Sequence, residues 1–180
     1  YGTTVAWAAA PEGCVDTATG ALLPEIEDIE VVTLTAALQK TGGAAQAKTF
    51  TVTIYPEVAW EGSGVADDPY LVRSAAHLDA VRKKMGDGVY FKQTQDINLA
   101  GIGWQPIGDA DDPFTGCYDG NGKTVAHLTL RDGEDAADYL GLFGYVGNEE
   151  SGNGTLQNLR LQDADVSSLE AAYVGGLAGY

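Results

Sequence analysis

The sequence predicts an all-β protein made of two modules, the second of them a solenoid of stacked repeats. Within the first 57 residues, two segments alternate apolar and polar residues, which is typical of strands. Near the C-terminus a glycine-rich block returns after 35 positions (Gly144 to Gly179, 179 − 144), a spacing typical of solenoid repeats. The 24 glycines suit the many turns that short strands require.

The first module is expected to contain at least three strands. Residues 32–38 and 50–54 place apolar side chains at alternate positions, as half-buried strands do. Gly42 lies in the turn between them, so these two strands are predicted to form a hairpin. An earlier strand is expected over 4–8, with Trp7 in the core, because aromatic residues dominate small β cores.

This block resembles the C-terminal part of bacterial immunoglobulin-like domains, especially the shortened, atrophied type. The segments that carry the resemblance are residues 4–7, 32–36 and 48–54. A complete immunoglobulin sandwich takes about 100 residues, so the resemblance implies a partial or shortened β-sandwich over 1–58.

A short helix is expected near 75–85, at the start of the second module. Ser74 can cap its first turn, and Leu78 and Val81 fall on one helical face. His77 is predicted to be solvated or to take part in the cap. We expect this helix to cover the first coil of the solenoid, since an open edge invites aggregation.

Short strands follow the helix and supply the repeating coils. Glycine is expected to provide the positive φ of their sharp turns. Strands are predicted over 90–93, 97–99, 124–131 and 156–162. Interior columns are predicted from the leucines at 128, 130, 159 and 161, and from Leu142 with Leu177.

The second block, residues 61–180, resembles the start of bacterial surface proteins that carry the GLUG motif, named for a Gly-Leu-x-Gly core. Upstream segments 62–72, 90–99 and 104–124 follow the family pattern in the same order. The resemblance implies a right-handed parallel β-helix in a secreted or surface-anchored protein, commonly linked to adhesion. The motif residues are Gly141, Leu142 and Gly144, then Gly176, Leu177 and Gly179.

The charge balance argues against two classes of partner. Asp and Glu number 26 against 10 Lys and Arg, a formal net charge of −16. Such a chain repels nucleic acid and anionic lipid. No apolar run of about 18 residues predicts a membrane span. Because neither a signal peptide nor a sorting tail is recognisable, we expect a fragment of a longer protein.

No catalytic set can be assembled from these residues. The two histidines do not form an H-E-x-x-H zinc motif, and no pair of carboxylates can be placed on adjacent coils. No catalytic residue, cofactor or metal ligand is therefore predicted. The acidic loops could bind Ca²⁺, with a solvated surface as the other interpretation. Their residues are Asp109, Asp111 and Asp112, then Asp132, Glu134, Asp135 and Asp138.

The only cysteines, Cys14 and Cys117, make neither a disulfide scaffold nor a metal site. Both are expected to be buried as small apolar side chains. A bridge between them is the other interpretation, and it would have to join the two modules.

Aromatic side chains are the candidate ligand-binding residues, because their rings can stack on sugars. Tyr139 and Tyr173 hold equivalent positions in the two repeats, which favours a structural ladder over a single binding site. Trp104 is interpreted as a core residue, and Tyr180 as exposed. The possible stacking residues are Trp60, Tyr118, Tyr139 and Tyr173.

Two hypotheses on function follow. The first is a non-enzymatic, extracellular structural or adhesive module of a bacterial cell-surface protein, with host or environmental glycans or surface proteins as partners. The second is an accessory, non-catalytic region of a secreted carbohydrate-active enzyme or peptidase. A wall-anchoring tail with more repeats would favour the first, and a catalytic motif elsewhere in the parent protein the second.

Overall fold

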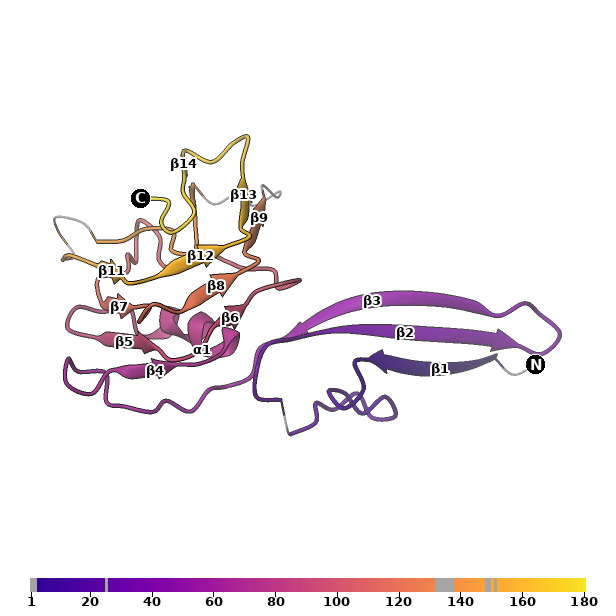
Figure 1. The fold of residues 1–180 in the computed structure, drawn as a ribbon. Coiled ribbons are helices and arrows are strands. Elements are labelled where there is room, and N and C mark those ends of the chain that lie inside the picture. The colour runs from indigo at the N-terminus through magenta and orange to yellow at the C-terminus, as the bar shows by residue number, and fades with distance from the viewer. Residues whose placement is uncertain (1–2, 25, 132–137, 148–149, 151) are drawn as a thin grey trace. The chain divides into compact units, whose positions relative to one another are not determined.

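The computed structural model describes residues 3–24, 26–131, 138–147, 150 and 152–180 (Figure 1). The described elements are strands, apart from one short helix and the 3₁₀ turn that continues it, which confirms the predicted all-β class. The chain divides into two compact units, Tyr1–Pro56 and Glu57–Tyr180.

The first unit is a three-stranded antiparallel sheet. Its central strand is β2 (Glu30–Lys40), which pairs with β1 (Thr3–Ala10) on one side and with β3 (Gln46–Ile54) on the other. Strands β2 and β3 form the predicted hairpin. The alternating side chains therefore separate into one apolar face and one face rich in threonine.

Only one end of the apolar face is covered by the segment that follows β1. There, Cys14 packs against Val32 in a small buried cluster. At the other end Trp7, which lies opposite Ala36, is 45% exposed. Its ring centroid lies 6.1 Å from that of Phe50. The prediction that Trp7 fills the core is therefore wrong, because it lies on the uncovered part of this face.

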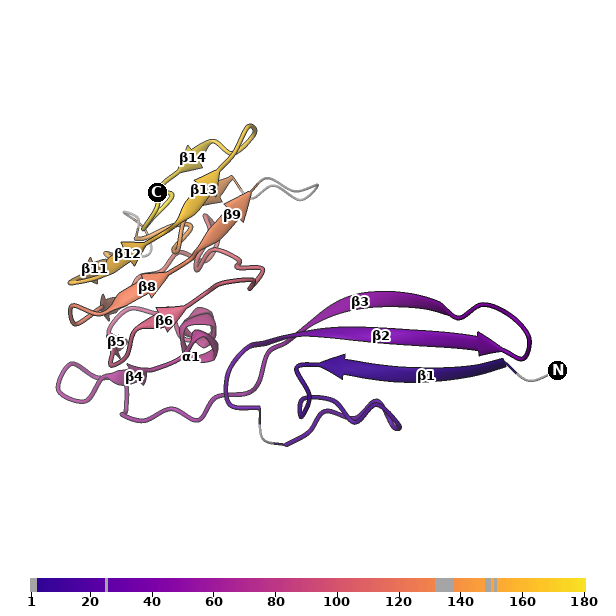
Figure 2. The ribbon, with the colours of Figure 1, turned by 45° about the vertical axis from the view of Figure 1, so that its right-hand side comes forward.

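The second unit is a stack of coils in which each strand pairs in parallel with a strand of the next coil (Figures 1 and 2). The strands form four separate parallel ladders, so successive coils lie over one another with the same segments aligned. The ladders are β4 (Tyr70–Val72), β5 (Tyr90–Gln93), β7 (Cys117–Asp119) and β11 (Thr155–Gln157); β6 (Ile97–Asn98), β8 (Thr124–Ala126) and β12 (Arg160–Gln162); β9 (Thr129–Arg131) with β13 (Asp165–Ser167); and β10 (Tyr139–Leu140) with β14 (Tyr173–Val174).

The register between coils corrects the predicted leucine column. Leu130 lies opposite Val166, 36 positions later (166 − 130), whereas Leu161 belongs to β12 in a different ladder. The corners explain this register, because His127 and Asp163 are also 36 positions apart and both have positive φ, 59° and 50°. Residues 127–130 and 158–161 have similar sequences because both alternate polar and apolar side chains as strands do. They do not occupy equivalent places in successive coils.

The predicted helix is shorter than expected. Helix α1 (Ala75–Ala80) continues as the 3₁₀ turn η1 (Val81–Lys83). As predicted, Ser74 caps it: the Ser74 Oγ accepts the backbone N–H of His77 at 3.3 Å, and Leu78 and Val81 are fully buried. His77 is buried and not solvated. Its Nδ1 lies 2.9 Å from Ser74 Oγ and its Nε2 lies 3.4 Å from the carbonyl oxygen of Ala59.

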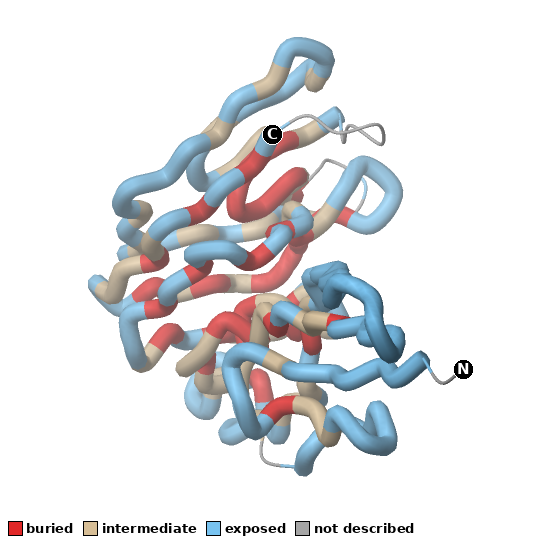
Figure 3. The backbone as a smooth tube through the Cα atoms, turned by 90° about the vertical axis from the view of Figure 1, so that its right-hand side faces the viewer, coloured by how far each residue is buried: buried red, intermediate tan, exposed pale blue. Residues whose placement is uncertain are grey.

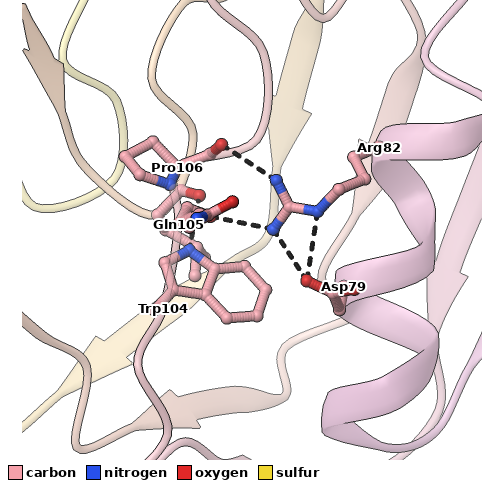
Figure 4. Close-up of polar contacts among 6 residues, drawn as sticks. Asp79, Arg82, Trp104, Gln105 and Pro106 are labelled. Carbon is pink, nitrogen blue, oxygen red and sulfur yellow. Dashed lines mark hydrogen bonds and ion pairs between the residues drawn. The ribbon is translucent and has the colours of Figure 1, made fainter. Parts of the chain in front are cut away.

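Arg82 ties this helical segment to the coil (Figure 4). Its guanidinium pairs with Asp79 at 2.8 Å and donates to the carbonyl oxygens of Gln105 at 2.9 Å and Pro106 at 3.1 Å. The same guanidinium lies 5.5 Å from the ring of Trp104, which is buried as predicted. The helix is therefore fastened through charge, hydrogen bonds and ring contact together.

Aromatic rings fill the interior of the coils. Phe114 and Tyr118 are fully buried, and their ring centroids lie 4.9 Å and 5.6 Å from that of Phe143. Tyr118 is therefore not an exposed stacking residue, because it occupies the inward position of β7, a strand covered by neighbours on both sides. Buried positions of the second unit extend from the first coil and its helix through the middle coils (Figure 3), whereas the described residues from 152 onward are half-buried or exposed.

The interior also contains one fully paired amide. Gln93 is 0% exposed, and its Nε2 donates to the carbonyl oxygens of Gln95 at 2.8 Å and Thr124 at 3.1 Å. Its Oε1 accepts the Tyr118 hydroxyl at 3.2 Å. These bonds link two successive coils, and burial raises the pKa of the Tyr118 hydroxyl.

Candidate functional site

The two glycine motifs lie directly over one another. Tyr139 pairs with Tyr173, 34 positions later (173 − 139), and Phe143 bridges Ala178, 35 positions later (178 − 143). The second copy therefore has one residue more than the first. The added residue lies between the β14 strand and Leu177, where the sequence reads Gly175-Gly176.

This extra residue leaves two glycines that can match Gly141. Counting on from the pair Tyr139 and Tyr173 places Gly175 beside it, whereas counting back from the bridge between Phe143 and Ala178 places Gly176 beside it, as in the sequence motif. A Cβ on Gly175 would lie 1.9 Å from the carbonyl oxygen of Ala178, so no side chain fits there. A Cβ on Gly176 would meet only Leu161 Cδ2, at 3.2 Å.

The motif positions require glycine because the backbone there lies very close to other backbone atoms. A positive φ is not the reason. Glycines at other turns of the coils, such as Gly101 and Gly122, have the expected positive φ, whereas the motif glycines Gly141, Gly144 and Gly179 do not. A Cβ on Gly144 would lie 2.4 Å from the carbonyl oxygen of Gly108, and one on Gly179 would lie 2.8 Å from that of Gly144. On Gly141 it would lie 2.6 Å from the carbonyl oxygen of Phe143. The backbones are too close for any other residue.

An earlier coil supplies a third glycine that the sequence analysis placed in a different motif. Ile107 bridges Phe143, just as Phe143 bridges Ala178. The spacing in the sequence could have revealed this glycine. Each bridging residue is followed by glycine, and the bridging residues are 36 and 35 positions apart (143 − 107 and 178 − 143). The resulting column through three coils is Gly108, Gly144 and Gly179.

The stacking of the two motifs brings four tyrosine rings together, and we call this group the tyrosine face: Tyr139, Tyr145, Tyr173 and Tyr180. The rings of Tyr139 and Tyr173 are stacked, with centroids 5.1 Å apart and an angle of 7° between their planes. Tyr145 and Tyr180 form a second column at 4.5 Å and 31°. Tyr139 meets Tyr145 edge to face at 4.9 Å. The ladder geometry expected for Tyr139 and Tyr173 is therefore present.

The tyrosine face is accessible from solvent, and two of its hydroxyls have a raised pKa. Tyr173 is 44% exposed and Tyr180 is 56% exposed, while Tyr139 and Tyr145 are half-buried. Partial burial raises the pKa of Tyr139, and the neighbouring Tyr173 and Asp138 raise it further. Partial burial and the neighbouring Tyr180 likewise raise the pKa of Tyr145. The hydroxyls of Tyr139 and Tyr145 therefore keep their protons and can donate hydrogen bonds.

The predicted stacking residues do not form one site. Only Tyr139 and Tyr173 come together, whereas Trp60 lies beside the helix in another aromatic cluster. The Trp60 ring is 5.1 Å from Tyr70 and 5.4 Å from His77, so its contacts are with the chain itself. Tyr145 was not among the predicted stacking residues. The signal for it was available, since each glycine motif ends on a tyrosine as well as beginning with one.

Among the residues that the structure describes, no group of three or more His, Cys, Asp or Glu side chains could hold an ion, and calcium binding by the acidic loops stays a prediction. Asp109 Oδ1 accepts the backbone N–H groups of Asp111 at 2.9 Å and Asp112 at 2.8 Å, so this loop closes on itself as a turn. Asp132, Glu134 and Asp135 lie outside the described residues.

The two cysteines are free thiols, one in each unit. Cys14 is buried as expected, while Cys117 is half-buried at the start of β7. Burial raises the pKa of the Cys117 thiol, and the charge of Asp119 raises it further. Across the described ranges, the helical segments are too short and too polar to cross a bilayer.

Comparison with known proteins shows partial relatives. No family model matches the chain. It is 39% identical over 126 residues to a "Putative Gly-rich membrane protein" of Evansella cellulosilytica, and 37% identical over 128 residues to the halomucin of Haloquadratum walsbyi. Each match covers 66% of this chain, but only 14% of the first protein and 1% of the second.

Among solved structures, the chain is similar to a "putative immunoglobulin A1 protease" from Bacteroides ovatus. The TM-score is 0.48 and the identity 28%, and the match covers 60% of this chain and 30% of that one.

Proposed function

We propose that this chain is a non-enzymatic structural and adhesive module of a bacterial cell-surface protein, located outside the cell. The observation that carries the proposal is the repetition of one contact set on successive coils. The glycine column passes through three coils, and each tyrosine column places one ring over the next. A unit that repeats its own contacts makes a stiff support, and each coil presents the same residues on the same side.

The relatives support the location. Two thirds of the chain is similar to part of a protein named as a Gly-rich membrane protein, and the same share is similar to part of a halomucin. Since the chain spans 14% or less of either protein, the activities and partners of those whole proteins do not transfer.

We also propose identities for the two units. The second unit would be a right-handed β-helix of the GLUG type, supported by its parallel ladders and by the two stacked glycine motifs. The first would be a partial or shortened immunoglobulin-like domain, supported by its antiparallel sheet with one apolar face.

Adhesion would use the tyrosine face, with glycans of host or environmental surfaces as the partner class. Its ring edges and hydroxyl groups offer apolar contact and hydrogen-bonding groups close together, a combination that suits sugars. A formal net charge of −16 argues against nucleic acid or anionic lipid as the partner.

A glycan array with the purified chain, in the presence and absence of Ca²⁺, tests the adhesive part. We expect reproducible binding to one glycan class, lost in a Tyr173→Ala, Tyr180→Ala double variant. The matched control is Tyr55→Ala, which removes a tyrosine that is 50% exposed in the first unit. Silence across the array, or equal loss in the control, would refute adhesion through this face and leave only the structural role.

A further inference from the structure

We propose that the tyrosine face is an oxidative cross-linking site, at which Tyr145 and Tyr180 couple into dityrosine and join two successive coils covalently. Their ring centroids are 4.5 Å apart with 31° between the planes. Two phenol rings at this distance and angle overlap, so the ring carbons of one lie close to the ring carbons of the other.

The ortho carbons are the reactive atoms in this chemistry. A phenoxyl radical carries much of its unpaired electron density there, so two such radicals join through an ortho–ortho carbon bond. Because the fold already holds the two rings together, the coupling step is intramolecular and needs no encounter between chains. Tyr139 and Tyr173 are parallel but farther apart, at 5.1 Å, and form the second pair in order.

The oxidant class is a haem peroxidase acting with hydrogen peroxide. Each phenol gives up one electron and one proton, and the two electrons and two protons reduce hydrogen peroxide to two waters. The two radicals form the carbon–carbon bond, and the displaced ortho hydrogens move to the oxygens and restore both hydroxyls. The protein loses two hydrogen atoms in total.

Exposure favours this pair for a second reason. Tyr180 is 56% exposed and can be oxidised from solution, while its partner Tyr145 is half-buried beside it. A radical formed on Tyr180 therefore has a second phenol in ring contact before it can meet another molecule. The cross-link would close the chain between 145 and 180 and fasten adjacent coils, which restricts the unfolded state.

The test uses the whole purified chain at low micromolar concentration with a peroxidase and hydrogen peroxide. We expect a monomer that is lighter by two hydrogen atoms, dityrosine fluorescence, a cross-linked peptide joining 145 and 180, and a raised Tm. Tyr180→Phe and Tyr145→Phe should each abolish this product, whereas Tyr55→Phe, which removes an equally exposed tyrosine, should retain it.

Three outcomes would overturn the proposal: cross-linked dimers without the intramolecular product, a cross-link mapped to another pair, or an unchanged yield in Tyr180→Phe. Circular dichroism of each variant before oxidation confirms that loss of product is not loss of fold. The proposed extracellular location matters to this inference only because the protein would meet the oxidant there. The cross-linking reaction in solution does not depend on glycan binding, so the two experiments can fail independently.

Discussion

Replacing Gly144 by alanine should destabilise the second unit far more than an ordinary glycine substitution. The new Cβ would lie 2.4 Å from the carbonyl oxygen of Gly108 and 3.0 Å from the Cβ of Pro106. Real Cβ atoms essentially never come within 3.0 Å of another heavy atom in this way, so the two coils must separate locally. The motion is opposed because the neighbouring coils are hydrogen-bonded on both sides of this residue.

The magnitude follows from those contacts. Overpacking costs about 1–3 kcal/mol. Separation also stretches the bond from the Gly144 N–H to the carbonyl oxygen of Ile107 (2.8 Å) and the bond from the Tyr180 N–H to that of Gly144 (3.0 Å). Weakening two such bonds adds about 1 kcal/mol, since each contributes about that much when fully formed. We expect a loss of about 3 kcal/mol, which lowers Tm by roughly 10 °C for a unit of this size.

Urea unfolding followed by tryptophan fluorescence measures this loss. A Trp7→Phe background removes the tryptophan of the first unit, so that Trp60 and the buried Trp104 report on the second. The matched control is Gly176→Ala, whose Cβ would meet only the flexible end of Leu161 and should cost under about 1 kcal/mol. Equal effects at the two positions would refute the argument that contact between coils selects these glycines.

Four further outcomes are expected. Gln93→Ala should cost about 3 kcal/mol in the same urea assay, because it opens a cavity and leaves the buried Tyr118 hydroxyl without its acceptor. Arg82→Ala should cost about 2 kcal/mol by losing its bonds to Asp79 and to two carbonyl oxygens; an unchanged midpoint would contradict the fastening role. Stability should fall as pH rises above about 10, because Tyr118 ionises there in the unfolded chain but keeps its proton in the fold, where burial raises its pKa. Tyr118→Phe should flatten that fall in a pH series of melts. Finally, Tm should rise with sodium chloride up to about 1 M, since salt screens repulsion within a chain of net charge −16; a falling Tm would show that attractive ion pairs dominate.

Local features were predictable because their causes lie within a few residues. The alternation over 32–38 and 50–54 predicted the hairpin, since side chains of a strand point to opposite faces in turn. Ser74 predicted the helix start, because capping involves only the first helical turn. The recurrence of glycine after 35 residues predicted stacked copies of one motif, and the bridges between coils confirm the stacking.

The tyrosine face was only half visible in the sequence. Tyr139 and Tyr173 were recognised as equivalent, but Tyr145 gained significance only when the second column of rings formed beside the first. Tyr118 shows the opposite failure. Its strand has three residues, too few for alternation to show which side faces inward, and its burial depends on strands that are far away in sequence.

The sequence by itself determined the class of fold, the turns, the helix start and the presence of a repeat, because each depends on neighbours along the chain. Only the tertiary structure decided the register: which residue lies over Leu130, that the second motif holds one residue more than the first, and that Gly108 begins the glycine column. Register between coils is set by backbone pairing across 21 to 38 positions (91 − 70 and 155 − 117) and by the room left inside. A one-residue insertion such as the one in the second motif shifts that pairing without changing the local pattern, so spacing alone cannot locate it.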